Sequence, residues 1–396
     1  MDRAATLAST AALRAESRAL KSKGLHRSLF GITSPRGATF VAGRRRLVNF
    51  GSNDYLGSGT DPAVARAAAD ACRRWGTGSG ASRLLSGNLA LHVSLERRLA
   101  AFKGEEAATV FSSGYLANLG ALTALAGEGD LVVLDRLNHA SLVDGARLSR
   151  AKLWVYPHRD AAALDALLAR ASGFRRKLVA TDAYFSMDGD TAPLDRLLEV
   201  SRKHGALLVV DEAHSTGVFG PRGRGLAEAF RLEGKIDVVM GTLSKALGSV
   251  GGFIAGSRAL KDHLTNRART FIYTTAPAPA ASAAALACLG WITKDPAPRE
   301  RLWRNIRVLR EALREAGIPV LESEGPVIPV PVPSPAEGAR LQASLAKEGL
   351  YVPLIRTPSV PRGAERLRVS VTAAHERAHL DALVRTLKPR RKRSTR

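Results

Sequence analysis

Short apolar runs that alternate with helical stretches are the feature that most constrains how this chain can fold. Helical stretches such as Ala161–Ala171 and Leu194–His204 separate these runs. The apolar runs are Thr109–Phe111, Leu131–Leu134, Leu153–Tyr156, Leu178–Thr181, Ala206–Val210, Val238–Met240 and Phe253–Ala255. Strands that alternate with helices predict an α/β domain with a mainly parallel sheet. Because the runs are continuously apolar, we expect helices to cover both faces of that sheet.

A proline-rich segment, Pro277–Pro279, interrupts this alternation, and beyond it the pattern predicts a smaller α+β domain. Its expected elements are one long helix from about Ala280 to Arg314, β-like runs at Val327–Val332 and Leu367–Val371, and a final helix at Ala374–Leu387. We also expect an amphipathic helix in the N-terminal arm. The expected regions are an arm and small-domain segment over 1–50, a large domain over 51–285, a small domain over 286–387 and a disordered basic tail over 388–396.

The composition is that of a globular protein, since 45% of the 396 residues are hydrophobic and 24% are charged. The two cysteines, Cys72 and Cys288, exclude a disulfide scaffold and argue against a cysteine-based metal cluster. The most apolar long run, residues 276–290, is short and interrupted by proline, and the first thirty residues have no apolar signal-peptide core. We therefore expect a cytoplasmic protein with no membrane span and no metal site.

Positive charge is in large excess, with 59 basic and 36 acidic residues and a net charge of +23. The tail Lys388–Arg396 holds six basic residues and no acidic one, and removing those six charges still leaves +17. A basic surface attracts polyanions such as phosphorylated ligands or acidic carrier proteins. The chain is only 5% aromatic and shows no nucleic-acid-binding signature, so nucleic-acid binding through the tail is a minor alternative.

Two motifs at the ends of predicted strands contain residue types that can bind a ligand and react with it. Asp211–His214 (DEAH) follows one strand, and Gly241–Gly248 (GTLSKALG) follows the next. Ligands of open α/β sheets bind at the carboxyl ends of strands, and a partly desolvated lysine such as Lys245 can form a Schiff base. The 34 residues from Asp211 to Lys245 span about one strand–helix–strand unit, which places both at neighbouring strand ends. Taken alone, a helix-capping Asp211 and a surface Lys245 in a glycine-rich loop remain open alternatives.

Seven ordered segments share the pattern of one enzyme family. They are Asn49–Gly57, Gly76–Arg83, Asn138–Gly145, Phe185–Leu194, Asp211–Gly220, Gly241–Gly248 and Phe271–Pro277. Together they resemble the α-oxoamine synthases, which depend on pyridoxal 5′-phosphate (PLP) and have the aspartate-aminotransferase fold. The resemblance runs from about residue 25 to residue 387. It implies fold type I, in which a large mainly parallel-sheet domain binds PLP and a smaller α+β domain follows.

The resemblance assigns roles around the cofactor. Lys245 matches the lysine that carries PLP as a Schiff base, and Asp211 matches the carboxylate that pairs with the pyridine nitrogen. A carboxylate there keeps the ring protonated, which makes it an electron sink. His214 matches the residue bonded to the phenolic oxygen, and His139 matches the imidazole that stacks on the ring. Ser186 matches a hydroxyl that contacts the cofactor.

The same resemblance implies a phosphate site shared between subunits. Gly114 and Tyr115 match the phosphate-binding turn, where the amides at a helix start supply donors and a favourable dipole. The hydroxyls of Thr242 and Ser244 are expected to add donors to the phosphate. The region around Thr275 matches a segment that reaches the neighbouring subunit's phosphate, which implies a homodimer with the active site at the interface.

Substrate-binding residues also follow from the resemblance. Arg356 matches the arginine that binds the amino-acid carboxylate, for which its planar fork is suited. Asn53 and Ser359 match substrate-contacting positions. An N-terminal arginine also contributes in the family, and Arg27 is the candidate, with His26 as an alternative alignment.

The reaction that the resemblance implies is a decarboxylative condensation of L-alanine with a pimeloyl thioester, on coenzyme A or a carrier protein, in biotin biosynthesis. The segments Phe185–Leu194 and Ile355–Glu376 favour these substrates. A sister synthase that uses glycine or serine with another acyl thioester is the alternative. A nicotinamide-dependent dehydrogenase is not expected, because Gly76, Gly78 and Gly80 follow a predicted helix end rather than an apolar strand.

Overall fold

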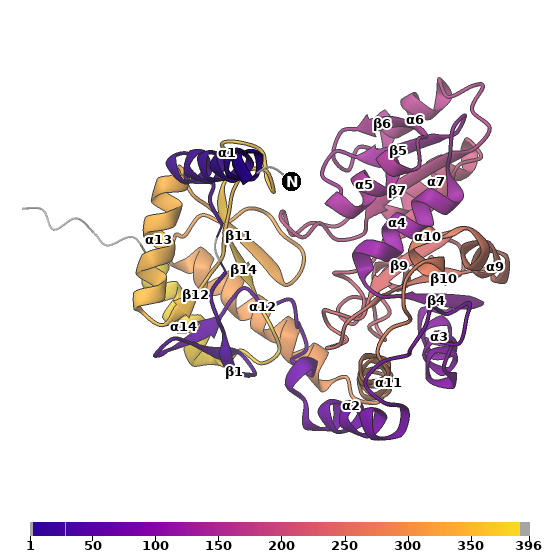
Figure 1. The fold of residues 1–396 in the computed structure, drawn as a ribbon. Helices are drawn as coiled ribbons and strands as arrows, with labels where there is room; N and C mark the ends of the chain where they lie inside the picture. The colour runs from indigo at the N-terminus through magenta and orange to yellow at the C-terminus, as the bar shows by residue number, and fades with distance from the viewer. Residues whose placement is uncertain (1–2, 28, 389–396) are drawn as a thin grey trace, which may run out of the picture.

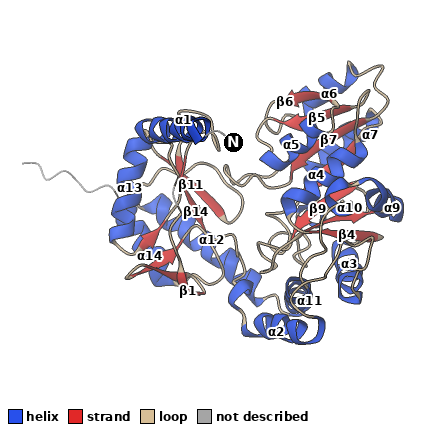
Figure 2. Ribbon diagram, in the orientation of Figure 1, coloured by secondary structure: helices blue, strands red, loops and turns tan. Residues whose placement is uncertain are grey.

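The computed structural model describes residues 3–27 and 29–388, which fold into two lobes (Figure 1). The larger lobe contains β4 to β10 and the helices between them, and helices lie on either side of its strands (Figure 2). The smaller lobe combines the N-terminal segment with the C-terminal part of the chain. The expected basic tail lies outside the described residues, except for Lys388.

Seven strands form the sheet of the larger lobe. In sheet order they are β4 (Ala107–Phe111), β10 (Gly252–Gly256), β9 (Val238–Thr242), β8 (Leu207–Asp211), β7 (Lys177–Asp182), β5 (Leu131–Asp135) and β6 (Lys152–Tyr156). All run parallel except β10, which pairs antiparallel with both of its neighbours. The predicted α/β fold with a mainly parallel sheet is confirmed, and each of the seven apolar runs lies on one of these strands.

Alternate residues of the central strands enter two apolar layers, because successive strand side chains point to opposite faces. In β5, Leu131 and Val133 belong to one layer, whereas Val132 and Leu134 belong to the other. The first layer receives side chains from α2 (Pro62–Trp75), α3 (Ala90–Lys103), α6 (Ala161–Ala169), α7 (Leu194–Lys203) and α11 (Pro279–Lys294). The second receives them from α4 (Gly114–Leu125), α5 (Ala140–Leu148), α9 (Arg258–Arg267) and α10 (Arg269–Ile272). Helices therefore cover both faces, as expected.

Two small sheets build the other lobe. The antiparallel sheet consists of β11 (Val327–Pro331), β14 (Arg366–Ser370) and β13 (Leu354–Ile355). The other consists of β1 (Thr33–Arg36), β2 (Thr39–Ala42), β3 (Arg45–Asn49) and β12 (Leu350–Tyr351). The remaining elements are α12 (Ala297–Glu315), α13 (Pro335–Lys347), α14 (Arg377–Leu387), η1 (Ser58–Thr60) and α8 (Leu226–Ala229). The pairing of β3 with β12 ties the N-terminal segment to the C-terminal lobe.

The prediction of one long helix from Ala280 to Arg314 was wrong. The chain forms α11 and α12 instead, with a break at Asp295 and Pro296. Proline disfavours helical backbone at the residue before it and lacks an N–H for the helix ladder. Asp295 accordingly has an extended conformation, with φ −121° and ψ 108°. The break lets α12 leave α11 and pack against α14.

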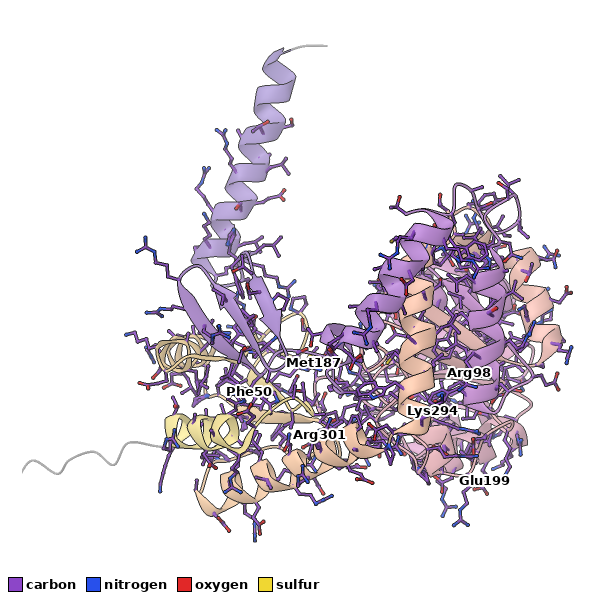
Figure 3. All side chains as sticks on the ribbon, turned by 90° about the horizontal axis from the view of Figure 1, so that it is seen from below. Phe50, Arg98, Met187, Glu199, Lys294 and Arg301 are labelled. Carbon is purple, nitrogen blue, oxygen red and sulfur yellow. The ribbon has the colours of Figure 1, made fainter. Side chains whose placement is uncertain are left out.

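The expected N-terminal helix is α1 (Arg3–Ser22), which projects away from the rest of the molecule (Figure 3). Within the described ranges, every helix is too short or too polar to cross a bilayer.

Candidate active site

Several of the predicted cofactor residues converge at the carboxyl ends of adjacent strands. Asp211 ends β8, Thr242 ends β9, and Lys245 follows in the next loop. Asp182 ends β7 and is paired in register with Asp211. His139 lies at the start of α5, and its backbone N–H donates to Asp182 Oδ2 at 2.8 Å. Parallel strands bring their ends to one edge of the sheet, so the distant motifs meet there.

Asp211 is a buried carboxylate with two fixed donors. Its Oδ2 accepts from Asn118 Nδ2 at 2.7 Å, and its Oδ1 accepts from the backbone N–H of Ala213 at 2.8 Å. Burying a charged group is costly unless hydrogen bonds hold it, and both oxygens are held here. The carboxylate is therefore preorganised to face a cationic N–H.

The side-chain amine of Lys245 has the properties of a reactive nucleophile. Within the described part of the chain, its Nζ has no hydrogen-bond or ion-pair partner. Burial lowers the pKa of Lys245 to about 8, although the negative charges of Asp211 and Asp182 act in the opposite direction. The positive charge of Arg368 lowers this pKa further. Because a neutral amine is the nucleophile in Schiff-base formation, Lys245 fits the role of a carbonyl-binding lysine.

His214 is a buried residue of the site. Its Nδ1 lies 2.7 Å from the hydroxyl oxygen of Tyr55, which is itself fully buried. Burial holds the pKa of His214 well below its usual range, and the positive charges of Lys245 and Arg368 act in the same direction. The His214 ring is therefore neutral, so one ring nitrogen can donate a hydrogen bond to an oxygen and the other can accept one. Tyr55 was missed as a site residue, although it lies in the Asn49–Gly57 segment that carries the family resemblance.

The start of α4 has the features of a phosphate site. Ser113 caps the helix with a hydrogen bond to its first turn, and Gly114 is the first helical residue. A Cβ on Gly114 would lie 2.9 Å from the terminal methyl of Met240 and 3.3 Å from Thr242 Cβ, so a larger residue would have to displace these side chains. The Thr242 hydroxyl donates to the Gly251 carbonyl at 2.9 Å and lies 2.7 Å from the Ser244 hydroxyl. The other helix-start amides, beside the exposed Ser244 hydroxyl, suit an anion.

Tyr115 and Ser186 each contact another residue of the site, Tyr115 next to His139 and Ser186 next to Arg368. The Tyr115 hydroxyl donates to Asp144, and its ring lies edge-on to His139 with centroids 6.5 Å apart. Ser186 follows β7 and is half-buried, and its carbonyl accepts a 2.6 Å hydrogen bond from Arg368 Nε. The contacts of both residues with a cofactor remain predictions.

These residues fit PLP. The site offers an amine for the aldehyde, a buried carboxylate for the ring nitrogen and two histidines for the ring and its oxygen. It also offers helix-start amides for the phosphate. The chemistry of the donor set thus matches each polar group of the cofactor.

The candidate substrate residues form two groups in the structure, one around Arg356 and one around Asn53. Arg356 donates to the His26 carbonyl at 2.8 Å, and the backbone N–H of Ser359 donates to the Arg356 carbonyl at 3.1 Å. The structure therefore brings the His26 backbone to the arginine, whereas Arg27 is exposed. Asn53 is half-buried, and its Oδ1 accepts from the Arg368 guanidinium at 3.1 and 3.2 Å. The roles of these residues in binding a substrate remain predictions.

Arg368 was missed by the sequence reasoning. It lies on β14 and is buried, and it also donates to the Ser370 hydroxyl at 2.9 Å. Its charge lowers the pKa of both His214 and Lys245, so it contributes to the electrostatics of the site. The available signal was a charged residue within the apolar run Leu367–Val371, since a buried arginine needs partners.

Thr275 lies on the surface of the subunit. Its backbone pairs with Ser82, and its carbonyl accepts from the Ser112 hydroxyl at 3.4 Å. Large apolar side chains are exposed beside this pair, with Leu85 79% and Tyr273 72% exposed. A surface of this kind suits contact with another copy of the chain, although the role of Thr275 toward a partner remains a prediction.

A lysine of lowered pKa, a buried carboxylate and a helix start at the carboxyl edge of this sheet define a PLP-dependent enzyme of fold type I. The chain belongs to the aminotransferase class I and II family, whose sequence profile matches residues 45–387.

Curated relatives and solved structures agree with this assignment. The 8-amino-7-oxononanoate synthase of Anaeromyxobacter dehalogenans (strain 2CP-1) is 50% identical over 373 residues, which cover 94% of each chain. That of Geobacter sulfurreducens is 48% identical over 377 residues, covering 95% of this chain and 96% of the relative. A serine palmitoyltransferase structure from S. paucimobilis has a TM-score of 0.90 at 34% identity and covers 98% of both chains. The 8-amino-7-oxononanoate synthase structure from Francisella tularensis has a TM-score of 0.75 at 28% identity, covering 86% of this chain and 97% of that one.

Proposed function

We propose that this chain is a PLP-dependent 8-amino-7-oxononanoate synthase of biotin biosynthesis. It condenses L-alanine with a pimeloyl thioester and releases CO₂ and the free thiol. The observation that carries the reaction class is the Lys245 amine, whose lowered pKa and neighbouring Asp211 carboxylate suit a lysine that binds a carbonyl cofactor. The substrate assignment is supported by relatives of that name that are 43–52% identical over more than nine-tenths of this chain.

The cofactor would be held by residues already described. Lys245 would bind the aldehyde, Asp211 the ring nitrogen and His214 the phenolic oxygen, while the start of α4 and Ser244 would bind the phosphate. When bound, PLP withdraws electrons from the Cα of an amino acid attached to it, which makes the Cα proton easier to remove.

Lys245 would act as the general base and general acid of the reaction. In the chain itself the pKa of Lys245 is lowered to about 8, close to the operating pH, which suits a general base. It takes the Cα proton of alanine and returns a proton after CO₂ has left. Arg356 would orient the alanine carboxylate through its guanidinium fork. A neutral His139 can donate a hydrogen bond to the acyl carbonyl as that oxygen gains negative charge.

A second candidate is a sister synthase that joins serine to a long-chain acyl thioester. The observation in its favour is structural, because the serine palmitoyltransferase from S. paucimobilis has the higher TM-score, 0.90 against 0.75 for the Francisella protein. Arg356 and Lys245 would perform the same tasks in either reaction, so geometry near the amino acid does not distinguish the two.

A substrate panel tests the proposal. The purified protein with PLP is given L-alanine, glycine or L-serine in combination with pimeloyl-, acetyl- or palmitoyl-coenzyme A. Thiol release and the mass of the product are then measured. We expect rapid thiol release and 8-amino-7-oxononanoate only with alanine and the pimeloyl thioester. Preferred turnover of serine with the palmitoyl thioester would establish the sister activity instead.

We also propose that the enzyme acts as a cytoplasmic homodimer. The exposed Leu85 and Tyr273, on either side of the Ser82–Thr275 pair, support a face that a second copy covers. Light scattering at micromolar concentration should give twice the mass of the 42.1 kDa chain. Replacing Leu85 and Tyr273 with Asp should give monomers, whereas a dimer that survives both changes would place the interface elsewhere.

A further inference from the structure

A chain of buried hydrogen bonds connects Asp211 to His139. Asn118 Nδ2 lies 2.7 Å from Asp211 Oδ2 and 2.8 Å from Ser141 Oγ. Ser141 Oγ lies 2.8 Å from His139 Nδ1. Asn118 comes from α4, Ser141 from the first turn of α5, and both side chains are buried. Two helices and a strand thus supply one continuous path between two site residues.

One arrangement of protons satisfies this path. A carboxylate accepts hydrogen bonds, so the Asn118 amide must present Nδ2 rather than Oδ1 to Asp211. Its second N–H then donates to Ser141 Oγ, which can still either accept from or donate to His139 Nδ1. The backbone N–H of Ser141 points to the same nitrogen at 3.3 Å. A backbone N–H can only donate, so Nδ1 is the acceptor of this bond and of the Ser141 hydroxyl, and the ring proton of neutral His139 must be on Nε2.

We propose that Asn118 and Ser141 are positioning residues that keep His139 neutral with its proton on Nε2, and that they couple this state to the Asp211 carboxylate. His139 is then a hydrogen-bond donor through Nε2, which is the form that can assist an acyl carbonyl. This benefit to the reaction rests on the proposed function, whereas the tautomer itself does not.

Some of the charged groups around His139 raise its pKa and others lower it. Loss of water around the ring lowers the pKa of His139, and the positive charge of Lys245 lowers it further. The negative charges of Asp211 and Asp144 raise it, and the Tyr115 ring packs edge-on at 6.5 Å. The lowering effects prevail. Donation from Ser141 to Nδ1 acts in the same direction, because it occupies the lone pair that a proton would need.

Histidine NMR tests the proposal without any measurement of activity. The PLP-loaded protein, labelled with ¹³C and ¹⁵N at histidine and free of substrate, is titrated from pH 5 to pH 9. The chain has nine histidines, and the spectrum of His139→Gln identifies the relevant signals. We expect ¹⁵N shifts of an Nε2–H ring with a pKa below 6.5. In Ser141→Ala that pKa should rise by about half to one pH unit, the equivalent of one hydrogen bond, and the Nδ1–H form should appear.

A double-mutant cycle tests whether the path is continuous. If Asn118 acts on His139 through Ser141, Asn118→Ala should shift the His139 pKa when Ser141 is present. It should have no further effect in the Ser141→Ala background. Ser149→Ala is the matched control, because this buried hydroxyl at the end of α5 bonds to the Ala146 carbonyl at 2.7 Å, away from the path. It should leave the His139 signals unchanged.

Ser141→Cys protects the test against a folding defect. It fills nearly the same space with a weaker donor, so the shift should lie between those of the wild type and Ser141→Ala, with an unchanged circular dichroism spectrum. An Nδ1–H ring in the wild type would overturn the proposal. A His139 pKa that is the same in Ser141→Ala, Ser141→Cys and the wild type would also overturn it. An inactive substrate panel with the expected NMR shifts would reject the proposed function and leave the proton path standing.

Discussion

Asp182 and Asp211 are opposite each other in the pairing of β7 and β8, yet their surroundings differ. Asp211 accepts from two donors, a side-chain amide and a backbone N–H. Asp182 is buried to a similar degree but accepts from one donor, the backbone N–H of His139. Burial raises the pKa of Asp182 well above its usual range, and the charge of Asp211 raises it further. The pair therefore concentrates its negative charge on Asp211, where the ring nitrogen of PLP is expected.

The unequal sharing of negative charge between Asp182 and Asp211 predicts different results from two matched substitutions. Asp211→Asn removes the charge expected to pair with the cofactor and should weaken PLP binding by about 10- to 100-fold, the range for a hydrogen bond to a charged group. Asp182→Asn preserves an acceptor for His139 and removes a charge that is already disfavoured, so PLP affinity should change by less than about threefold. Equilibrium dialysis of the cofactor-free variants measures both constants. Equal losses in the two variants would refute this unequal sharing.

The lowered pKa of Lys245 predicts the pH dependence of cofactor capture. Protonated amine cannot attack an aldehyde, so the rate of PLP attachment to the cofactor-free protein should rise with pH and level off above about 8. Stopped-flow absorbance between pH 6.5 and pH 10 follows this rate, and the Lys245→Ala protein provides the blank. A rate that still rises steeply at pH 9.5 would mean that Lys245 keeps an ordinary lysine pKa.

Arg356 is expected to bind the amino-acid carboxylate. Arg356→Ala should raise the KM for the amino acid by about 10- to 100-fold, because a hydrogen bond to a charged group contributes about 1.5 to 3 kcal/mol. The KM for the acyl thioester should change little. Arg362→Ala, which removes an exposed arginine from the same loop, is the matched control. If the KM for the amino acid is unchanged in Arg356→Ala, the carboxylate binds elsewhere, and buried Arg368 becomes the next candidate.

His158 predicts a pH dependence of stability away from the reacting groups. It lies between two carboxylates, with Nδ1 2.9 Å from Asp135 and Nε2 2.9 Å from Asp190. Burial alone would lower the pKa of His158, but hydrogen bonds to these two carboxylates outweigh it and raise the pKa to about 9.

Because the folded-state pKa of His158 is raised, its contribution is fully present below about pH 6.5 and is lost as pH rises through 9. The wild type should therefore exceed His158→Gln in unfolding free energy by about 1 to 3 kcal/mol at pH 6. The difference should shrink by pH 10. Urea denaturation of the PLP-loaded proteins across that range measures it. A difference that does not vary with pH would show that the ring is not charged in the folded protein.

The sequence predicted the large sheet well because buried parallel strands leave a strong local signal. Each of the seven apolar runs lies on an observed strand, and the motifs at Asp211 and Lys245 meet at the ends of β8 and β9. The antiparallel direction of β10 has no local signature, since direction is set by the connection and by packing. The break between α11 and α12 was predictable from Pro296 and was missed.

The site residues that were missed depend on long-range contacts. Tyr55 reaches His214 across 159 positions of sequence, and Arg368 reaches Asn53 across 315. Neither contact follows from spacing along the chain. The short strands β1 to β3 were also missed, because a segment such as Arg45–Asn49 is mostly polar and acquires its structure by pairing with β2 and β12.

The most direct test of the account is to locate the cofactor on the chain. The protein is purified with PLP, reduced with borohydride and digested, and the modified lysine is identified by mass spectrometry. The account predicts that one lysine, Lys245, carries the phosphopyridoxyl group, and that Lys245→Ala loses both this label and turnover, by about 100-fold or more. A label on another lysine, or a Lys245→Ala protein that still turns over alanine at the wild-type rate, would contradict it.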